Sequence, residues 1–137
     1  MKNGYQIHNR ENSNTEIKDV LDKVEKHYRF VPNALAAMAE SPNSVLAYLA
    51  LDDLANTNSL TNEQRHIAFL TISREYNCSY CVAAHSAFAQ MGEVDGQIVQ
   101  CLRENEPLDD PKLNALQQMV SSMIKSAVAI SSPISSP

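Results

Sequence analysis

The sequence predicts an all-α fold, and three observations support this prediction. Apolar side chains recur every three or four positions in several stretches, which is the spacing of one face of a helix. No stretch of useful length alternates apolar and polar residues as a half-buried strand would, and the sequence contains no repeat. The chain has 137 residues and is 44% hydrophobic, which predicts one globular domain with a substantial core.

A polar arm and a first helix are predicted at the start of the chain. Residues 1–13 lack any periodicity, so we expect a flexible arm there, with His8 facing solvent. The next stretch places apolar side chains at helical spacing. These side chains belong to Ile17, Val20, Leu21, Val24 and Tyr28.

Prolines mark the beginnings of the next two predicted helices. Val31-Pro32 ends the first helix, and Pro32 fits the first turn of a second helix that runs to Glu40. Ser41-Pro42 begins a third helix, which gives way to a loop at residues 56–59. Its apolar side consists of Val45, Leu46, Leu49 and Ala50.

Two helices are predicted in the middle of the chain. Thr61 and Gln64 have the spacing of a capping box, which opens a helix that runs to about Tyr76. The next helix is rich in alanine, a strong helix former, and stops at Gly92, a residue that suits a helix C-cap.

Two further helices and a tail complete the prediction. Asp95 caps a short helix, and Asp110-Pro111 begins the last one. The last helix carries an apolar stripe formed by Leu113, Leu116, Met119, Val120 and Met123. We therefore expect a single helical domain over residues 1–126 and a disordered or atypical tail over the Ser- and Pro-rich residues 127–137.

Composition excludes several classes of function. The formal net charge is −5, and lysine and arginine form no dense cluster, so a nucleic-acid surface is not expected. No apolar run reaches the ~18 residues that would span a membrane. The first residues contain no apolar signal segment, and three cysteines suit redox or metal chemistry in a reducing cytoplasm. A cytoplasmic location is therefore predicted.

The most informative motif is Cys-x-x-Cys-x-x-x-His, formed by Cys78, Cys81 and His85. Residues three and four apart share one face of a helix, so these side chains are expected to meet in one small volume. A thiolate is the reactive form of cysteine, and an imidazole can accept or return its proton. The absence of strands disfavours a thioredoxin fold, and Val82 replaces the histidine of a haem-attachment motif.

The motif and its surroundings resemble a known family, the AhpD-like alkylhydroperoxidases of the carboxymuconolactone decarboxylase superfamily. The resemblance is carried by residues 60–86, which read LTNEQRHIAFLTISREYNCSYCVAAHS, and by the stretch VPNAL at residues 31–35. It runs from about residue 28 to about residue 120. It implies an AhpD-like multi-helix bundle that forms a homo-oligomer.

The resemblance also implies an activity. Peroxidase-type members of this family reduce hydroperoxides with the cysteine pair and need no haem or flavin cofactor. The expected partners are a hydroperoxide substrate and a dithiol or protein-disulfide reductant. By resemblance, Cys81 matches the peroxidatic cysteine, Cys78 the resolving cysteine and His85 the proton-relay histidine.

One position departs from the family pattern. Such peroxidases usually carry a glutamate twelve residues before the first cysteine, whereas His66 occupies that position here and Glu63 is the nearest glutamate. An imidazole can still pass a proton near neutral pH. His66 is therefore the fourth candidate catalytic residue.

Other interpretations of the same residues remain open. His66, Cys78, Cys81 and His85 supply two imidazoles and two thiolates, a credible tetrahedral zinc site. A decarboxylase or lactone-processing enzyme of the same fold is a third hypothesis, although such relatives generally lack the cysteine pair. A structural oligomer with a degenerate site is a fourth. Cys101 lacks a partner at motif spacing and is expected to be structural.

Overall fold

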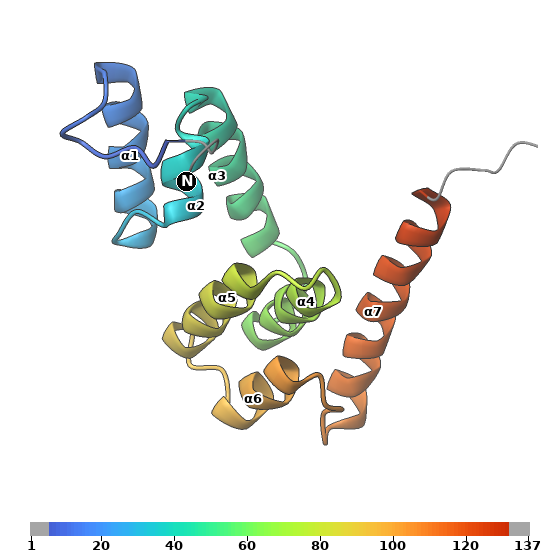
Figure 1. The fold of residues 1–137 in the computed structure, drawn as a ribbon. Coiled ribbons are helices and arrows are strands. Elements are labelled where there is room, and N and C mark those ends of the chain that lie inside the picture. Colours follow the sequence, from blue (N-terminus) through green and yellow to red (C-terminus); the bar gives the residue numbers. More distant parts are fainter. Residues whose placement is uncertain (1–5, 132–137) are drawn as a thin grey trace, which may run out of the picture. The chain divides into compact units, whose positions relative to one another are not determined.

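The computed structural model describes residues 6–131 as seven helices joined by turns and loops, with side chains described up to residue 127. No strand occurs within this range, so the all-α prediction is confirmed. The chain divides into two compact units, Met1–Asn58 and Ser59–Pro137. Figure 1 labels the helices of both units.

Parts of the predicted arm and tail fall outside the described residues. Residues 1–5 and 132–137 lie outside them. The last helix runs on to Ser131, beyond the end expected for the domain at residue 126. Within the described part of the chain, no helix is both long and apolar enough to cross a bilayer.

The first unit contains α1 (Thr15–Tyr28), α2 (Asn33–Met38) and α3 (Pro42–Asn56). Helix α1 packs against both α2 and α3, as can be followed in Figure 1. The side chain of Asn14 caps α1 by accepting a 2.9 Å hydrogen bond from the Ile17 N–H. Pro32 lies at the N-cap of α2 rather than in its first turn, and α2 ends at Met38 rather than at Glu40.

The core of the first unit is built on the apolar stripe predicted for the first helix. Its buried members are Ile17, Val20, Leu21, Val24, Leu35, Ala39 and Val45.

The expectation that His8 faces solvent is wrong, because His8 is only 7% exposed. Its Nε2 lies 2.7 Å from Oε2 of Glu40, and its backbone N–H donates to the Ala36 carbonyl at 3.1 Å. These partners offset the cost of burying a polar ring.

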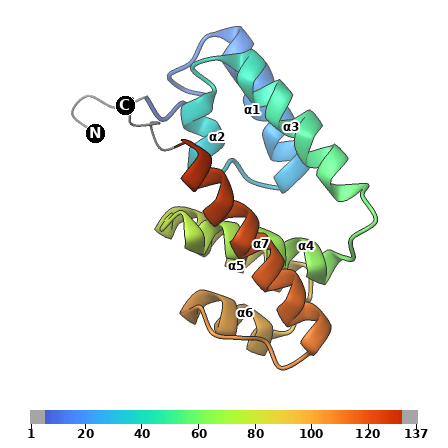
Figure 2. The ribbon, with the colours of Figure 1, turned by 90° about the vertical axis from the view of Figure 1, so that its right-hand side faces the viewer.

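The second unit contains α4 (Asn62–Glu75), α5 (Ser79–Met91), α6 (Gly96–Glu104) and α7 (Pro111–Ser131). Helix α4 packs against each of the other three, and Figure 2 shows α7 lying over α4. The buried core consists of Ile67, Leu70, Ala89, Val94, Val99, Leu102 and Leu108. Cys101 packs against this core, as expected for a structural cysteine.

Side-chain caps begin α4, α6 and α7 where the sequence predicts them. Thr61 Oγ1 accepts from the Gln64 N–H at 3.2 Å, and Gln64 Oε1 accepts from the Thr61 N–H at 3.0 Å, which completes the capping box. Asp95 accepts from the N–H of Gln97 at 2.7 Å. Asp110 accepts from the first N–H groups of α7.

Gly92 is the C-cap of α5, as predicted, but for a different reason than expected. The left-handed residue is Glu93, with φ of 59°, whereas Gly92 has φ of −86°. A Cβ on Gly92 would lie 2.8 Å from Nδ2 of Asn62, which donates to the Gly92 carbonyl at 2.8 Å. Glycine therefore makes room for a hydrogen bond between α4 and the end of α5.

Candidate functional site

The two motif cysteines lie at the beginning of α5 and form a disulfide. Cys78 is the N-cap residue, and Cys81 lies in the first turn. Their Cα atoms are 5.2 Å apart, within the range that a disulfide bridges. Both residues are partly exposed.

A tight turn between α4 and α5 places Cys78 at this position. Asn77 has a left-handed backbone with φ of 52°. The N–H of Cys78 donates to the Ser73 carbonyl at 3.0 Å, and the N–H of Asn77 donates to the Arg74 carbonyl at 2.9 Å. This pattern is a Schellman motif, and asparagine is one of the residues that tolerate its left-handed position. The turn ends α4 and lets the next helix begin at once with a cysteine cap.

The helix start favours negative charge on sulfur. Sγ of Cys78 accepts a hydrogen bond from the Cys81 N–H at 3.2 Å, which makes this sulfur the side-chain cap of α5. Unpaired N–H groups and the helix dipole stabilise an anion at such a position. In the reduced protein, the same environment would lower the pKa of a thiol.

His85 lies one helical turn after Cys81 and is held by aromatic contacts. Its ring stacks on Phe69 of α4, with centroids 4.9 Å apart and planes 16° apart. Phe88 meets the same imidazole edge-on at 6.2 Å. The stack fixes the orientation of the His85 ring, which lies on the same helix as Cys81.

His66 lies at the other end of the helix pair. Its Nε2 lies 3.4 Å from the place that a Cβ on Gly92 would occupy, so His66 is next to the C-terminal end of α5. Gly92 follows Cys81 by roughly 16 Å along the axis of α5. Nδ1 of His66 is buried without a hydrogen-bond partner among the described residues. Burial lowers the pKa of His66, and the charge of Arg65 lowers it further. The ring of Phe69 approaches both histidines, at 6.4 Å from His66 and 4.9 Å from His85.

The four proposed zinc ligands therefore do not meet around one point. Two of them are joined as a disulfide, and His66 lies at the far end of α5. Among residues 6–131, no group of three or more histidine, cysteine or acidic side chains is placed to hold a metal ion.

Tyr80, between the cysteines, is 46% exposed and lies on the surface beside the disulfide.

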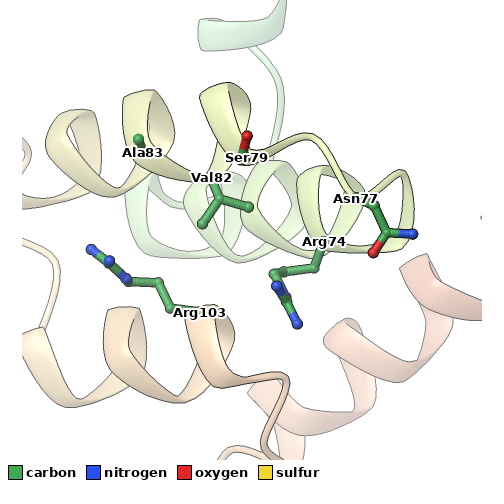
Figure 3. Close-up of a pocket in the computed structure, with 6 residues that line it drawn as sticks. All are labelled: Arg74, Asn77, Ser79, Val82, Ala83 and Arg103. Atoms are coloured by element: carbon green, nitrogen blue, oxygen red, sulfur yellow. The ribbon is translucent and has the colours of Figure 1, made fainter.

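A pocket beside the motif was missed by the sequence reasoning. It has a volume of about 340 Å³ and is lined by Arg74, Asn77, Ser79, Val82, Ala83 and Arg103. Figure 3 shows that these side chains come from the end of α4, the turn after it, the start of α5 and the last turn of α6. Its two arginines are far apart in the sequence, so no local pattern could have predicted that they line one pocket.

Glu75 was also missed as an anchor between helices. It accepts a hydrogen bond from the Ser121 hydroxyl, and its Oε1 lies 3.4 Å from Nζ of Lys125. The Ser121 hydrogen bond lowers the pKa of Glu75, and Lys125 contributes in the same direction. Glu75 therefore ties the end of α4 to α7, three residues before the disulfide begins.

Comparison with protein-family models finds no match for this sequence, and comparison with curated proteins finds none either. The function must therefore be inferred from the site itself. That site combines a disulfide at a helix start, a stacked histidine one turn further along, and a pocket lined by two arginines.

Proposed function

We propose that this protein is a thiol-dependent hydroperoxide reductase, a peroxidase-type oxidoreductase, that uses Cys81, Cys78 and His85. The observation that carries the proposal is the disulfide-forming pair at the start of α5, with a histidine one turn beyond it. A bridge that closes so short a loop restrains little of the unfolded chain. Redox chemistry is therefore a better explanation of the pair than stability.

The first step is an attack on the peroxide. With both cysteines reduced, the Cys81 thiolate attacks one oxygen of the hydroperoxide, so that an S–O bond forms and the O–O bond breaks. The alkoxide leaves with a proton and becomes an alcohol, while Cys81 becomes a sulfenic acid. His85 takes the thiol proton of Cys81 and returns it to the leaving oxygen.

The second step forms the disulfide. The sulfur of Cys78 attacks the sulfenic acid on Cys81, the S–S bond forms, and water leaves. One thiol of a dithiol or protein-disulfide reductant then attacks Cys81 and expels Cys78 as a thiolate, and the second thiol of the reductant releases Cys81 from this mixed disulfide. The Cys81 N–H that bonds to Cys78 Sγ supports this order, because it stabilises the leaving thiolate.

His66 is proposed to support the site from a distance. Its burial and lowered pKa keep the imidazole neutral near pH 7. Its separation from the disulfide along α5 argues for a secondary role in proton transfer, with His85 as the main proton acceptor.

Two further features belong to the proposal. We expect a homo-oligomer, which the family resemblance implies. Several large apolar side chains are exposed and could be covered by a second copy, including Leu51 and Leu54 of α3 at 66% and 67% exposed. Met91, Met119 and Met123 in the second unit are also more than half exposed. A cytoplasmic location would keep the thiols supplied with reductant.

The test is turnover of a hydroperoxide panel with several dithiol donors. We expect peroxide loss to match donor oxidation, and to require both motif cysteines but not Cys101. A thiol count and a metal assay on the same sample distinguish the zinc hypothesis. Tightly held zinc that protects both thiols, with no turnover by any donor, would contradict the proposal.

A further inference from the structure

The pocket beside the disulfide has the lining of an anion site. Among the residues that the structure describes, two arginines line it and no aspartate or glutamate does. In Figure 3, Arg103 extends from α6 toward α5, Arg74 extends from the end of α4, and Val82 points between them. The amide of Asn77 and the hydroxyl of Ser79 add polar groups to the same lining.

The charges of both arginines are available to a ligand. Within the described residues, neither Arg74 nor Arg103 forms an ion pair with a carboxylate. Nε of Arg74 is buried and has no hydrogen-bond acceptor there. A buried donor left unpaired costs free energy. A planar guanidinium suits carboxylate and phosphate oxygens in particular.

The pocket is lined by chain neighbours of both cysteines. Its lining includes Asn77 and Ser79, the residues on either side of Cys78, and Val82, the residue after Cys81. Successive helical residues are rotated by about 100°, so Val82 faces about 100° away from Cys81 around α5, and Ser79 and Ala83 face about 160° away. An arc of this size around a helix about 10 Å across is on the order of 9–14 Å. A ligand of that length could reach from the pocket around the helix to the disulfide.

We infer that the pocket bounded by Arg74 and Arg103 binds the carboxylate or phosphate group of a small molecule whose other end reacts at Cys78 and Cys81. This inference rests on the proposed function in taking the cysteine pair as the reacting centre. It adds the substrate class, an acidic molecule with several bonds between its anionic group and its reactive oxygen or sulfur. That molecule is either the hydroperoxide or the dithiol.

The first experiment measures anion binding alone. The oxidised full chain is titrated with inorganic phosphate at constant ionic strength, while the backbone amide signals of Ser79 and Ala83 are followed by nuclear magnetic resonance. We expect saturating shifts, with affinity about tenfold weaker in Arg103→Gln and largely restored in Arg103→Lys. Lys112→Gln removes the same charge from an exposed position on α7 outside the pocket and should bind phosphate normally.

The second experiment identifies which reactant carries the anion. One arm follows reduction of the disulfide by a carboxylate-bearing dithiol and by its uncharged amide. The other arm follows oxidation of the reduced protein by a carboxylate-bearing hydroperoxide and by its methyl ester. In one of the two arms, the acid should react faster than its neutral analogue, and Arg103→Gln should lower the ratio of the two rates about tenfold. The arm that shows this preference identifies the reactant that carries the anionic group.

The outcomes separate this inference from the proposed function. Shifts that do not saturate, or that persist unchanged in Arg103→Gln, would overturn the anion site. Phosphate binding without an arginine-dependent preference in either arm would overturn its link to the disulfide. A protein that no hydroperoxide oxidises would refute the reductase proposal, whereas the phosphate titration and the dithiol arm would still decide the inference. Arg103 is exposed, so the deciding variant Arg103→Gln is expected to fold.

Discussion

The backbone N–H of Cys81 donates a hydrogen bond to Sγ of Cys78 across 3.2 Å. One cysteine thus supplies the cap of the helix in which the other cysteine lies. A negative charge on Cys78 would be stabilised by this bond and by the helix start, whereas His85, the proposed proton acceptor of Cys81, lies one helical turn after it. The two sulfurs therefore have different environments, which fits different roles in the proposed reaction.

The first prediction concerns these roles. Cys81→Ser should abolish turnover and leave no sulfenic acid, because the attacking sulfur is gone. Cys78→Ser should allow one attack per chain and trap sulfenic acid on Cys81. Mass spectrometry after treatment with a sulfenic-acid reagent measures both, and Cys101→Ser is the matched control that should behave as the unmodified protein. Sulfenic acid on Cys78 in the Cys81→Ser variant would reverse the assignment.

The second prediction concerns His85. His85→Ala should slow reaction with peroxide about 100-fold near pH 7, because the Cys81 thiol loses its proton acceptor and its pKa rises. The rate should recover as the pH rises and the thiol ionises without help. Phe69→Leu, which removes the stacking partner, should cause a smaller loss of the same kind.

His66→Ala serves as the comparison in the same pH–rate profiles. Its effect should be smaller than that of His85→Ala, since His66 lies against Gly92 rather than near the disulfide. Equal losses in the two variants, with the same dependence on pH, would show that both histidines act directly on the reacting sulfur.

The third prediction concerns the turn before the disulfide. Asn77→Val should lower the free energy of unfolding by about 1–2 kcal/mol, because a β-branched residue is strained in the left-handed backbone that Asn77 adopts. Asn77→Gly should be tolerated, since glycine adopts this conformation without strain. Urea unfolding of the oxidised proteins compares the two. Equal stability of the valine and glycine variants would mean that the turn does not require a left-handed residue.

Local sequence features predicted the helices well, because helix ends depend on residues a few positions apart. Thr61 with Gln64, Asp95 and Asp110 all cap the helices that they were expected to begin. Gly92 was assigned correctly for the wrong reason, since the requirement comes from Asn62, which is remote in the sequence.

The candidate site was only partly predictable, because it depends on how helices align. The turn at Asn77 sets α4 against α5 so that Phe69 meets His85, whereas His66 reaches the end of α5. Spacing along one helix predicts neighbours such as Cys78 and Cys81, but not this alignment. A pocket lined by residues from distant segments, such as Arg74 and Arg103, cannot be predicted from any local pattern in the sequence.

The last prediction concerns Glu75, which joins the end of α4 to α7 through Ser121 and Lys125. Its pKa is lowered below the usual 4.5 in the folded protein, so the folded state favours the ionised form. The stabilisation should therefore be fully present above about pH 4.5 and be lost as the pH falls through the lowered pKa. Glu75→Gln should cost about 1 kcal/mol at pH 7 and progressively less in acid. Denaturant unfolding across this pH range measures the difference, with Glu106→Gln, an exposed glutamate of the same unit, as the control. A Glu75→Gln penalty that stays constant from pH 7 into acid would show that side-chain shape, and not charge, holds α7 to α4.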